Sequence, residues 1–249
     1  MEDQLNAQYV PESTSILVVA TGGSSGLGLE ALATYVKQSK NDIILVLGCR
    51  NPNNPTISTR LGEAPNVRKL DTFELELTSD DSIRRFATHV LETYSQRISV
   101  LLLCAGAMYA KRIVDSSGIE QTLKVNVLSQ GLLLECLWPR LLDPAGGMAC
   151  SRVVFVASSL HKKAAQQYEV SPSSIDSLLN GNPWKSMSAY SISKIGGRYE
   201  IATYRHRCQP RICSANGSFP RDLLVIATIH GLCYADVPVH NLHGRRQVS

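Results

Sequence analysis

The sequence predicts an α/β domain in which a parallel sheet is covered by helices on both faces. Short runs that are apolar throughout alternate with segments of helical periodicity, a pattern typical of parallel strands buried on both sides. The first apolar run also ends in a glycine-rich turn that leads directly into the first helical segment. Together the two observations favour a doubly wound fold, in which ligands bind at the carboxyl ends of the strands.

Six apolar segments are expected as strands, because each has the length of a strand and is bounded by polar or turn residues. They lie at residues 16–21, 42–48, within 67–77, 98–106, 151–159 and 223–231. Helical periodicity predicts helices at residues 27–38, 82–94, 117–142 and around Tyr190. Ser79, Asp80 or Asp81 can cap the second of these helices. No repeat or interdomain linker is seen, so residues 1–249 are expected to form one domain.

Two segments interrupt this alternation. Residues 51–59 are rich in Pro and Asn and are expected as a loop after the second strand. Residues 160–188 are expected as a long insertion before the helix around Tyr190. The apolar side chains of this insertion either wall a binding pocket or belong to a surface loop that one Trp anchors. They are Ile175, Leu178, Leu179, Trp184 and Met187.

The composition is that of a globular protein. The 249 residues are 44% hydrophobic and 18% charged, and the net charge of +4 falls wholly within residues 195–249, without a nucleic-acid motif. The seven cysteines form no CxxC pair, and the six histidines show no metal-ligand spacing. The first fifteen residues are too polar for a signal peptide, and no apolar run reaches about eighteen residues. We therefore expect a cytoplasmic protein with no metal, no nucleic-acid partner and no transmembrane segment.

The turn "TGGSSGLG" at residues 21–28 has the properties of a pyrophosphate-binding loop. Gly22, Gly26 and Gly28 allow a tight turn, let the backbone approach a ligand and place a helix N-terminus toward its negative charge. A glycine-rich turn alone is weak evidence. Its position between a buried strand and an amphipathic helix predicts a dinucleotide site of the Rossmann type.

Arg50 directly follows the second predicted strand. In a Rossmann sheet the end of this strand lies near the adenosine ribose, where an acidic residue accepts hydrogen bonds from the ribose hydroxyls and an arginine accommodates a 2′-phosphate. Arg50 therefore favours NADP(H) over NAD(H). The alternative is a solvated arginine in a loop.

The segment "YSISK" places Tyr190 and Lys194 on one face of a helix. A nearby ammonium lowers the pKa of a phenol from its usual value of about 10, which suits proton exchange with a carbonyl or an alcohol. Tyr-x-x-x-Lys is frequent by chance, but two other residues support a functional interpretation. Ser159 ends the fifth predicted strand, where its hydroxyl faces the ligand crevice, and Asn126 lies in a run where an unpaired polar group would be costly.

As a set, these motifs resemble the short-chain dehydrogenase/reductase family. "TGGSSGLG", "CAG" at 104–106, Asn126, "SS" at 158–159 and "YSISK" have the order and spacing of that family over residues 16–200. "LGCRN", "VASSLH" and "PWKSMSAYSISK" are most similar to retinol-dehydrogenase-like and related fungal and plant reductases. That subgroup generally uses NADP(H) on bulky apolar carbonyls or alcohols.

The resemblance implies a role for each catalytic candidate. Tyr190 would be the general acid/base, and Lys194 would hold the nicotinamide ribose and lower the pKa of the tyrosine. Ser159, the second serine of its pair, would hydrogen-bond the substrate oxygen in preference to Ser158. Asn126 would anchor a water in a proton relay to Lys194. The implied cofactor-binding residues are Gly22, Ser24, Ser25, Gly26, Leu27 and Gly28 along the pyrophosphate, Glu76 and Leu77 near the adenine, and Ala105 and Gly106 beside the adenosine ribose.

The sequence departs from the family pattern at two places. Cys104 replaces an asparagine that ties neighbouring strands in the family, so a looser sheet is expected. Residues 195–249 diverge more strongly, because two adjacent glycines weaken the helix after Lys194 and "IHG" lacks the expected proline. On this interpretation the nicotinamide clamp and the substrate lid are incomplete.

The predicted function is an NADP(H)-dependent oxidoreductase, a ketoreductase of secondary metabolism that transfers hydride between nicotinamide and a hydrophobic ketone, aldehyde or secondary alcohol. The alternative is a catalytically impaired family member that binds NADP(H) as a sensor or scaffold. The resemblance also implies a homodimer formed through the helix at 117–142 and the "YSISK" helix.

Overall fold

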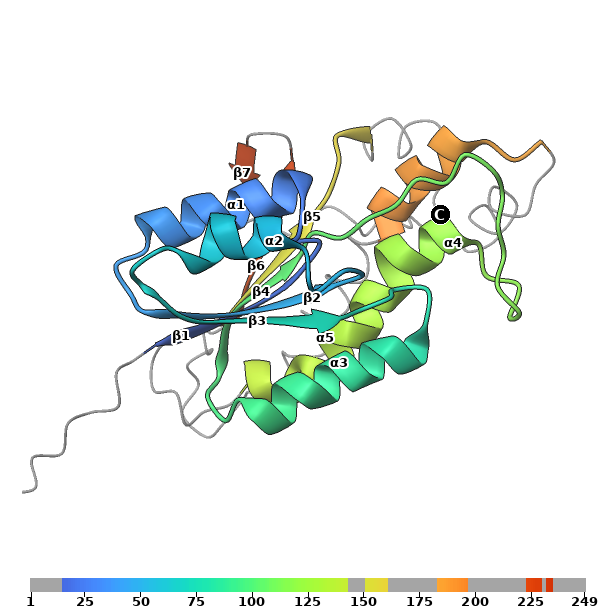
Figure 1. Ribbon diagram of the computed structural model, residues 1–249. Helices are drawn as coiled ribbons and strands as arrows, with labels where there is room; N and C mark the ends of the chain where they lie inside the picture. Colours follow the sequence, from blue (N-terminus) through green and yellow to red (C-terminus); the bar gives the residue numbers. More distant parts are fainter. Residues whose placement is uncertain (1–14, 143–150, 161–182, 197–222, 230–231, 235–249) are drawn as a thin grey trace, which may run out of the picture.

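The computed structural model describes residues 15–142, 151–160, 183–196, 223–229 and 232–234. Their strands form one seven-stranded sheet in the order β3-β2-β1-β4-β5-β6-β7 (Figure 1). The strands are β1 Ile16–Thr21, β2 Ile43–Cys49, β3 Val67–Glu74, β4 Ile98–Leu103, β5 Ser151–Val156, β6 Leu223–Ile229 and β7 Leu232–Tyr234. β1 to β6 run parallel, and β7 pairs antiparallel with β6. The predicted doubly wound parallel sheet is confirmed.

The helices connect successive strands. They are α1 Gly26–Gln38, α2 Pro55–Ile57, α3 Asp80–Thr93, α4 Gln121–Leu123 and α5 Ser129–Leu141, with π-helical turns η1 Ser58–Gly62 and η2 Lys124–Leu128. A further helix covers residues 186–196. Among the three cap candidates for α3, Ser79 accepts a hydrogen bond from the backbone N–H of Ser82 at 3.3 Å.

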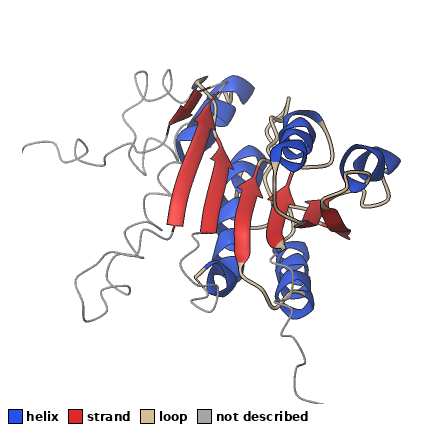
Figure 2. Cartoon of the chain, turned by 90° about the vertical axis from the view of Figure 1, so that its left-hand side faces the viewer, coloured by secondary structure: helices blue, strands red, loops and turns tan. Residues whose placement is uncertain are grey.

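Alternate side chains of the central strand β1 pack on opposite faces of the sheet. Leu17 and Val19 belong to a buried cluster with α3 and α5. Val18 and Ala20 belong to a second cluster with α1 and the helical turns after β2. Helices therefore lie on both sides of the strands, as two views at right angles show (Figures 1 and 2). Burial on both faces explains why the strand segments are apolar throughout.

The helix predicted over residues 117–142 begins later than its apolar pattern suggests. Gly118 has φ +80°, and the backbone N–H of Asp115 donates to the carbonyl of Ile119 at 3.0 Å, so this part of the chain turns back on itself. The Glu120 carboxylate then caps the helix by accepting from the N–H of Leu123 at 3.0 Å. The helix starts at Gln121 and contains a π-helical turn, a feature that apolar periodicity does not reveal.

Residues 51–59, expected as a loop, contain the start of a helical segment. The side chain of Asn54 accepts a hydrogen bond from the N–H of Thr56 at 3.1 Å, and Pro55 occupies the first helical position. A capping asparagine followed by proline is a helix-start signal, which the Pro/Asn-rich composition concealed. Of the divergent stretch 195–249, the end of the helix 186–196 and strands β6 and β7 are described. Its remaining residues lie outside the described part of the chain.

Candidate active site

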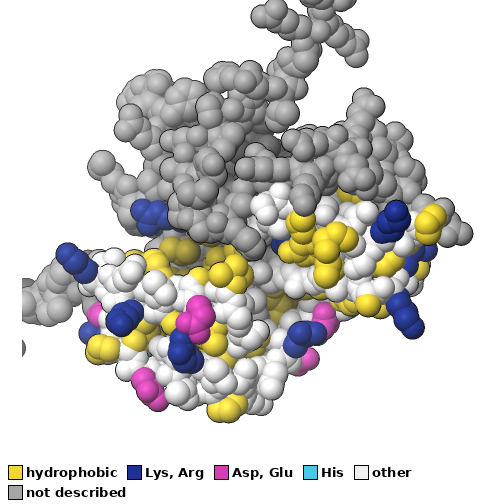
Figure 3. Space-filling view, turned by 90° about the horizontal axis from the view of Figure 1, so that it is seen from above, with side chains coloured by type: hydrophobic (Ala, Val, Ile, Leu, Met, Phe, Trp, Pro, Cys, Tyr) yellow, Lys and Arg dark blue, Asp and Glu magenta, His cyan; other side chains and the backbone are white. Residues whose placement is uncertain are grey.

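A cavity of about 910 Å³ lies at the carboxyl ends of the central strands. Thr21, Cys49 and Val156, the last residues of β1, β2 and β5, line it together with Cys104 just after β4. The chain reverses its direction of winding between β1 and β4, and ligands of doubly wound sheets bind at such a switch point. The face seen in Figure 3 carries patches of exposed hydrophobic side chains among single charged side chains of both signs.

The glycine turn forms one wall of this cavity. Gly22 has φ +67°, and a side chain there would place its Cβ 2.5 Å from the backbone nitrogen of Ala105. A Cβ on Gly28 would overlap the carbonyl oxygen of Gly22. Two of the three glycines are therefore required by close backbone approach, while Gly26 has φ +54° but open space around it. The predicted residues Gly22, Ser24, Ser25, Leu27 and Gly28 line the cavity.

The turn fits a pyrophosphate. α1 begins at the cavity, and its N-cap residue Ser25 makes no side-chain hydrogen bond to the first turn of the helix. The backbone N–H groups of that turn therefore stay available to an anion, which the helix dipole also favours. The missing Cβ atoms of Gly22 and Gly28 leave a backbone cradle that larger residues would fill.

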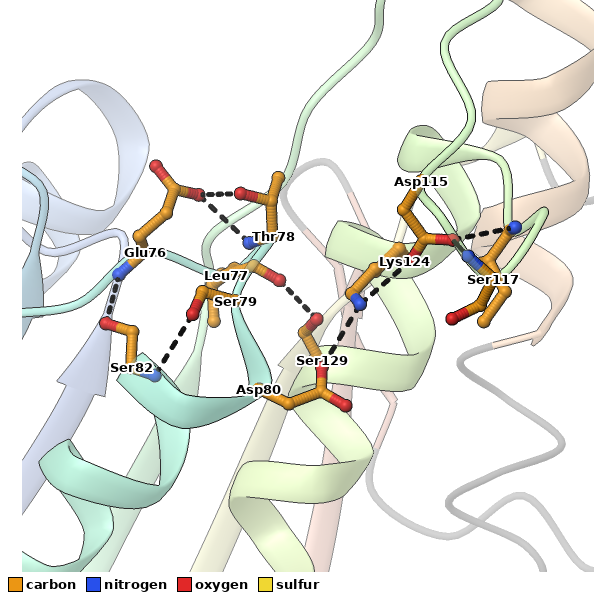
Figure 4. Close-up of polar contacts among 11 residues, drawn as sticks. Glu76, Leu77, Thr78, Ser79, Asp80, Ser82, Asp115, Ser117, Lys124 and Ser129 are labelled. Carbon is orange, nitrogen blue, oxygen red and sulfur yellow. Dashed lines mark hydrogen bonds and ion pairs between the residues drawn. The ribbon is translucent and has the colours of Figure 1, made fainter.

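Toward β2 and β3 the cavity is lined by Arg50, Glu76 and Leu77, three of the residues expected to hold the cofactor. Arg50 is exposed at the cavity rim directly after β2. The Glu76 carboxylate accepts from the backbone N–H of Thr78 at 2.9 Å and from its hydroxyl at 3.0 Å. The carbonyl of Leu77 accepts from the hydroxyl of Ser129 (Figure 4). Hydrogen bonds thus fix the turn between β3 and α3 that forms this end of the cavity.

An ion-pair cluster lies beside that turn. Lys124 of η2 contacts the Asp115 carboxylate at 3.0 Å and the Asp80 carboxylate at 3.2 Å (Figure 4). The hydrogen bond that the Lys124 ammonium donates to the Asp115 carboxylate is the first cause of the raised pKa of Lys124. The hydrogen bond that the backbone N–H of Ile119 donates to Asp115 is the first cause of the lowered pKa of Asp115. Lys124 therefore connects the start of α3 to the turn at residues 115–119.

Tyr190 and Lys194 both line the cavity from the helix 186–196. The Lys194 ammonium lies 5.5 Å from the centroid of the Tyr190 ring and donates to the carbonyl of Val156 at 3.1 Å. Lys194 is only 4% exposed, and burial lowers its pKa below 10.5, against an opposing effect of the Cys104 thiol. Within the described residues it forms no ion pair. A buried cation that lines a cavity and has no ion-pair partner among the described residues suits an anionic or hydroxyl-rich ligand.

Asn126 joins three segments behind the cavity. It is 1% exposed, and its amide donates to the carbonyl of Ala107 and to the hydroxyl of Ser193, both at 2.9 Å. Its carbonyl oxygen accepts from the N–H of Ala107 at 2.7 Å, and Ser193 in turn donates to the carbonyl of Tyr190 at 2.7 Å. The polar side chain predicted to need partners is therefore fully hydrogen-bonded. The described lining of the cavity does not include it.

The two serines after β5 have exchanged the places expected from sequence. Ser158 is buried and lines the cavity, whereas Ser159 is exposed and is absent from the described lining. This placement favours Ser158 as the serine that faces the ligand, while the role expected for Ser159 stays a prediction. β5 ends at Val156, the chain reaches a turn at Ser159, and this turn directs the second serine outward. The Ser158 hydroxyl accepts from the N–H of Leu160 at 3.3 Å, which a strand-based expectation does not foresee.

Further lining residues come from positions that the motifs did not identify. Met108 and Tyr109 follow the predicted Ala105 and Gly106, which also line the cavity, and Leu160 is a further lining residue. The only sequence signal for Met108 and Tyr109 was their position after "CAG". Of the insertion residues, Met187 lines the cavity, and Trp184 is absent from the described lining. Ile175, Leu178 and Leu179 lie outside the described residues.

The described residues contain no group of three or more His, Cys, Asp or Glu side chains suited to a metal ion. In the same part of the chain, no helix has the length and apolar character needed to cross a bilayer.

Comparison with known proteins places these features in a family context. A sequence model described as short chain dehydrogenase matches residues 16–174. The short chain dehydrogenase/reductase mfmJ of Annulohypoxylon moriforme is 27% identical over 192 residues, covering 76% of this chain and 55% of that protein. Retinol dehydrogenase 13 of Homo sapiens is 26% identical over 166 residues, covering 65% of this chain and 49% of that protein. This chain thus spans about half the length of these relatives.

Solved structures share the fold. An alcohol dehydrogenase from the archaeon Thermococcus sibiricus, complexed with 5-hydroxy-NADP, aligns with a TM-score of 0.58 and 16% identity over 86% of this chain and 76% of that chain. A short chain dehydrogenase from Salmonella enterica serovar Typhi aligns with a TM-score of 0.59 and 20% identity over the same shares. At these identities the likeness establishes the architecture.

Proposed function

The chain belongs to the short-chain dehydrogenase/reductase family, a family of oxidoreductases that use a nicotinamide cofactor, and we propose that it acts with NADP(H) on a hydrophobic ketone, aldehyde or secondary alcohol. One observation carries this proposal. The glycine turn and the pair Tyr190 and Lys194, far apart in the sequence, line the same cavity. A pyrophosphate cradle and a proton-exchanging tyrosine are the two parts that such a reaction needs in one place.

The cavity residues suggest how the cofactor would be held. Glycines 22 and 28 and the first turn of α1 would face the pyrophosphate, with Gly26 permitting the turn. Arg50 at the cavity rim would pair with a 2′-phosphate, which supports NADP(H) as the preferred cofactor. Glu76 and Leu77 would lie beside the adenine, and Ala105 and Gly106 beside the adenosine ribose. Lys194 would donate to the hydroxyls of the nicotinamide ribose.

The chemistry divides between cofactor and protein. When bound, the nicotinamide supplies or accepts the hydride. Tyr190 gives its phenolic proton to the substrate oxygen during reduction and takes it back during oxidation. The Lys194 ammonium stabilises the phenolate that remains. Ser158, which lines the cavity, would donate a hydrogen bond to the same oxygen, and Asn126 would anchor the relay that returns a proton.

An apolar substrate is supported by the side chains near Tyr190. Met108 and Met187 line the cavity while 51% and 53% exposed, and Leu160 also lines it. Large exposed methionines at the edge of a cavity offer adaptable apolar contact. Such a surface favours a hydrophobic carbonyl or alcohol over a charged substrate.

The first test is a thermal melt of the purified protein with NADPH, with NADH and without ligand. A ligand that binds only the folded state raises the midpoint, so we expect a large shift with NADPH and a smaller one with NADH. Arg50→Gln should reduce the NADPH shift toward that of NADH. Arg85→Gln, exposed on α3, is the matched control. A cooperative melt that neither dinucleotide moves would overturn the proposal.

Catalysis is tested separately with a panel of apolar carbonyls and NADPH. Tyr190→Phe should abolish turnover and leave the NADPH-induced midpoint shift in place. Tyr35→Phe, which removes a phenol from α1, controls for the substitution itself. Binding of NADPH by wild-type protein without turnover of any carbonyl or alcohol would favour the alternative role of a dinucleotide sensor or scaffold.

A further inference from the structure

Gln130 is a buried polar side chain that the proposed chemistry does not use. It lies on α5, is 1% exposed and is absent from the described lining of the cavity. Its amide nitrogen donates to the carbonyl of Ala105 at 3.0 Å, and its amide oxygen accepts from the hydroxyl of Thr21 at 3.1 Å. The Thr21 hydroxyl oxygen in turn accepts from the N–H of Ala105 at 3.3 Å. The three residues form a closed ring of hydrogen bonds.

This ring lies where the pairing of β1 and β4 ends. Thr21 and Leu103 are the last paired residues of the two strands, and one more backbone bond follows, from the N–H of Cys104 to the carbonyl of Thr21 at 3.3 Å. Beyond that bond, side-chain hydrogen bonds take over from the backbone pairing, and Gln130 connects Thr21 of β1 to Ala105 in the segment that follows β4.

The position of Ala105 and Gly106 is sensitive to small movements. On one side, a Cβ on Gly22 would lie 2.5 Å from the Ala105 nitrogen. On the other side, a Cβ on Gly106 would lie 3.2 Å from the Asn126 amide oxygen and 3.4 Å from the Lys194 ammonium. The segment therefore passes between the glycine turn on one side and the side chains of Asn126 and Lys194 on the other. A shift of this segment would change the position of both walls of the cavity.

We infer that Gln130 is a positioning residue for dinucleotide binding, because its amide holds Ala105 and Gly106 at the spacing from Thr21 that leaves the cavity open. This inference rests on the proposed function, since it concerns the affinity of the same cavity for NADP(H). Gln130 acts through Ala105 and Thr21 and does not touch the ligand itself. Losing its amide should therefore weaken cofactor binding without removing any group from the cavity.

The chain offers a matched control at the opposite end of the sheet. The hydroxyl oxygen of Ser151, which is fully buried, lies 2.7 Å from the carbonyl oxygens of both Ile98 and Leu141, and its single proton is donated to one or the other. It joins the start of β5 to the start of β4 and to the end of α5. Ser151→Ala thus removes a buried side-chain hydrogen bond far from the cavity. It reports the effect of such a loss on stability alone.

The experiment compares Gln130→Met, Gln130→Glu and Ser151→Ala with the wild type. NADPH dissociation constants come from fluorescence titration, and hydrogen exchange of the residue 105 and 106 amides is measured in cofactor-free protein. Gln130→Met leaves the Ala105 carbonyl and the Thr21 hydroxyl unpaired, so we expect roughly tenfold weaker binding and faster exchange at these amides. Ser151→Ala should lower the melting midpoint and leave the dissociation constant within about twofold of wild type.

Gln130→Glu adds a pH-dependent affinity, which would not be expected if Gln130 acted only through packing. A neutral carboxyl can donate to the Ala105 carbonyl as the amide does, whereas a carboxylate cannot, and burial raises the pKa of a carboxyl. The affinity of this variant for NADP⁺, taken relative to wild type at each pH between 8 and about 5.5, should therefore recover as the pH falls. Gln130→Met should show no such recovery.

Each outcome decides the inference. Wild-type affinity in Gln130→Met, an equal loss in Ser151→Ala, or a pH-independent ratio for Gln130→Glu would overturn it while leaving the proposed function intact. If the wild type binds neither dinucleotide, the proposed function fails, and the positioning role fails with it. Should Gln130→Met not fold, the pH dependence of Gln130→Glu still decides between the two roles.

Discussion

Lys194 is a buried cation that has no carboxylate partner among the described residues, a combination that is rare in proteins. Removing water from an ammonium disfavours its charged form, and burial is the first cause of its lowered pKa. The energetic cost is reduced if a ligand supplies oxygen atoms to the N–H groups that the Val156 carbonyl does not occupy. Cofactor binding and the charge of Lys194 should therefore favour one another.

The serine pair after β5 gives the sharpest prediction for a single side chain. Ser158→Ala should reduce kcat/KM for a carbonyl substrate by about 10²-fold, because a donor to the reacting oxygen stabilises developing charge. Ser159→Ala, one residue further along and exposed, should leave kcat/KM within about twofold of wild type. Steady-state kinetics with saturating NADPH measures both. The reverse ranking would show that the loop after β5 moves when substrate binds and would restore Ser159 to the role expected from sequence.

At the scale of secondary-structure elements, the strands were predictable because each is marked by local composition. β1, β2 and β4 lie within runs that are apolar throughout, and the glycine turn directly follows β1. Contacts between residues far apart in the chain have no comparable signature in the local sequence. Thr21 and Gln130 are 109 positions apart, and neither belongs to a periodic pattern that would reveal their hydrogen bond. Cys104 was expected to loosen the sheet, yet the Thr21 and Gln130 side chains join the two strands at this point.

Helix boundaries were harder to predict for the same reason. The turn before α4 depends on Gly118 with its positive φ and on backbone pairing between Asp115 and Ile119, neither of which apolar spacing encodes. The π-helical turn η2 lies inside the predicted helix 117–142, where apolar spacing does not distinguish it from α-helix. Asn126 could be identified from its polar character in that run, although its three partners could not.

The ion-pair cluster around Lys124 is expected to hold together the elements near the proposed adenosine site. Lys124→Met should lower the melting midpoint by a few degrees and weaken NADPH binding, because the start of α3 and the turn at 115–119 lose their common partner. Lys111→Met removes an exposed lysine from the segment before that turn and is the control. Differential scanning fluorimetry with and without NADPH measures both effects. Equal behaviour of the two variants would argue against a structural role for the cluster.

At the scale of the whole molecule, the candidate site and a second polar cluster lie at different places in the sheet. The site is at the switch point between β1 and β4, whereas Asp71 lies on β3 at the edge of the sheet. The Asp71 carboxylate accepts from the Tyr94 hydroxyl at 2.9 Å and contacts the ring nitrogen of His89 at 2.8 Å. His89 lies in α3 and Tyr94 is its C-cap residue, so this cluster fixes the C-terminal part of α3 against β3. Stability and dinucleotide binding should therefore respond to different substitutions.

Acid denaturation tests that separation. Burial alone would raise the pKa of Asp71, but the hydrogen bonds from His89 and Tyr94 outweigh it and hold the pKa below 3.8. A carboxyl whose pKa is depressed by folding stabilises the protein above its unfolded-state pKa, and that contribution is lost as the pH falls through the folded-state value. Asp71→Asn should thus be less stable than wild type at neutral pH, and the difference should shrink below about pH 4. Urea unfolding at several pH values measures this, with Glu74→Gln, exposed on the same strand, as the control. A difference between Asp71→Asn and wild type that stays constant down to the acid transition would show that the loss came from packing rather than from the charge of Asp71.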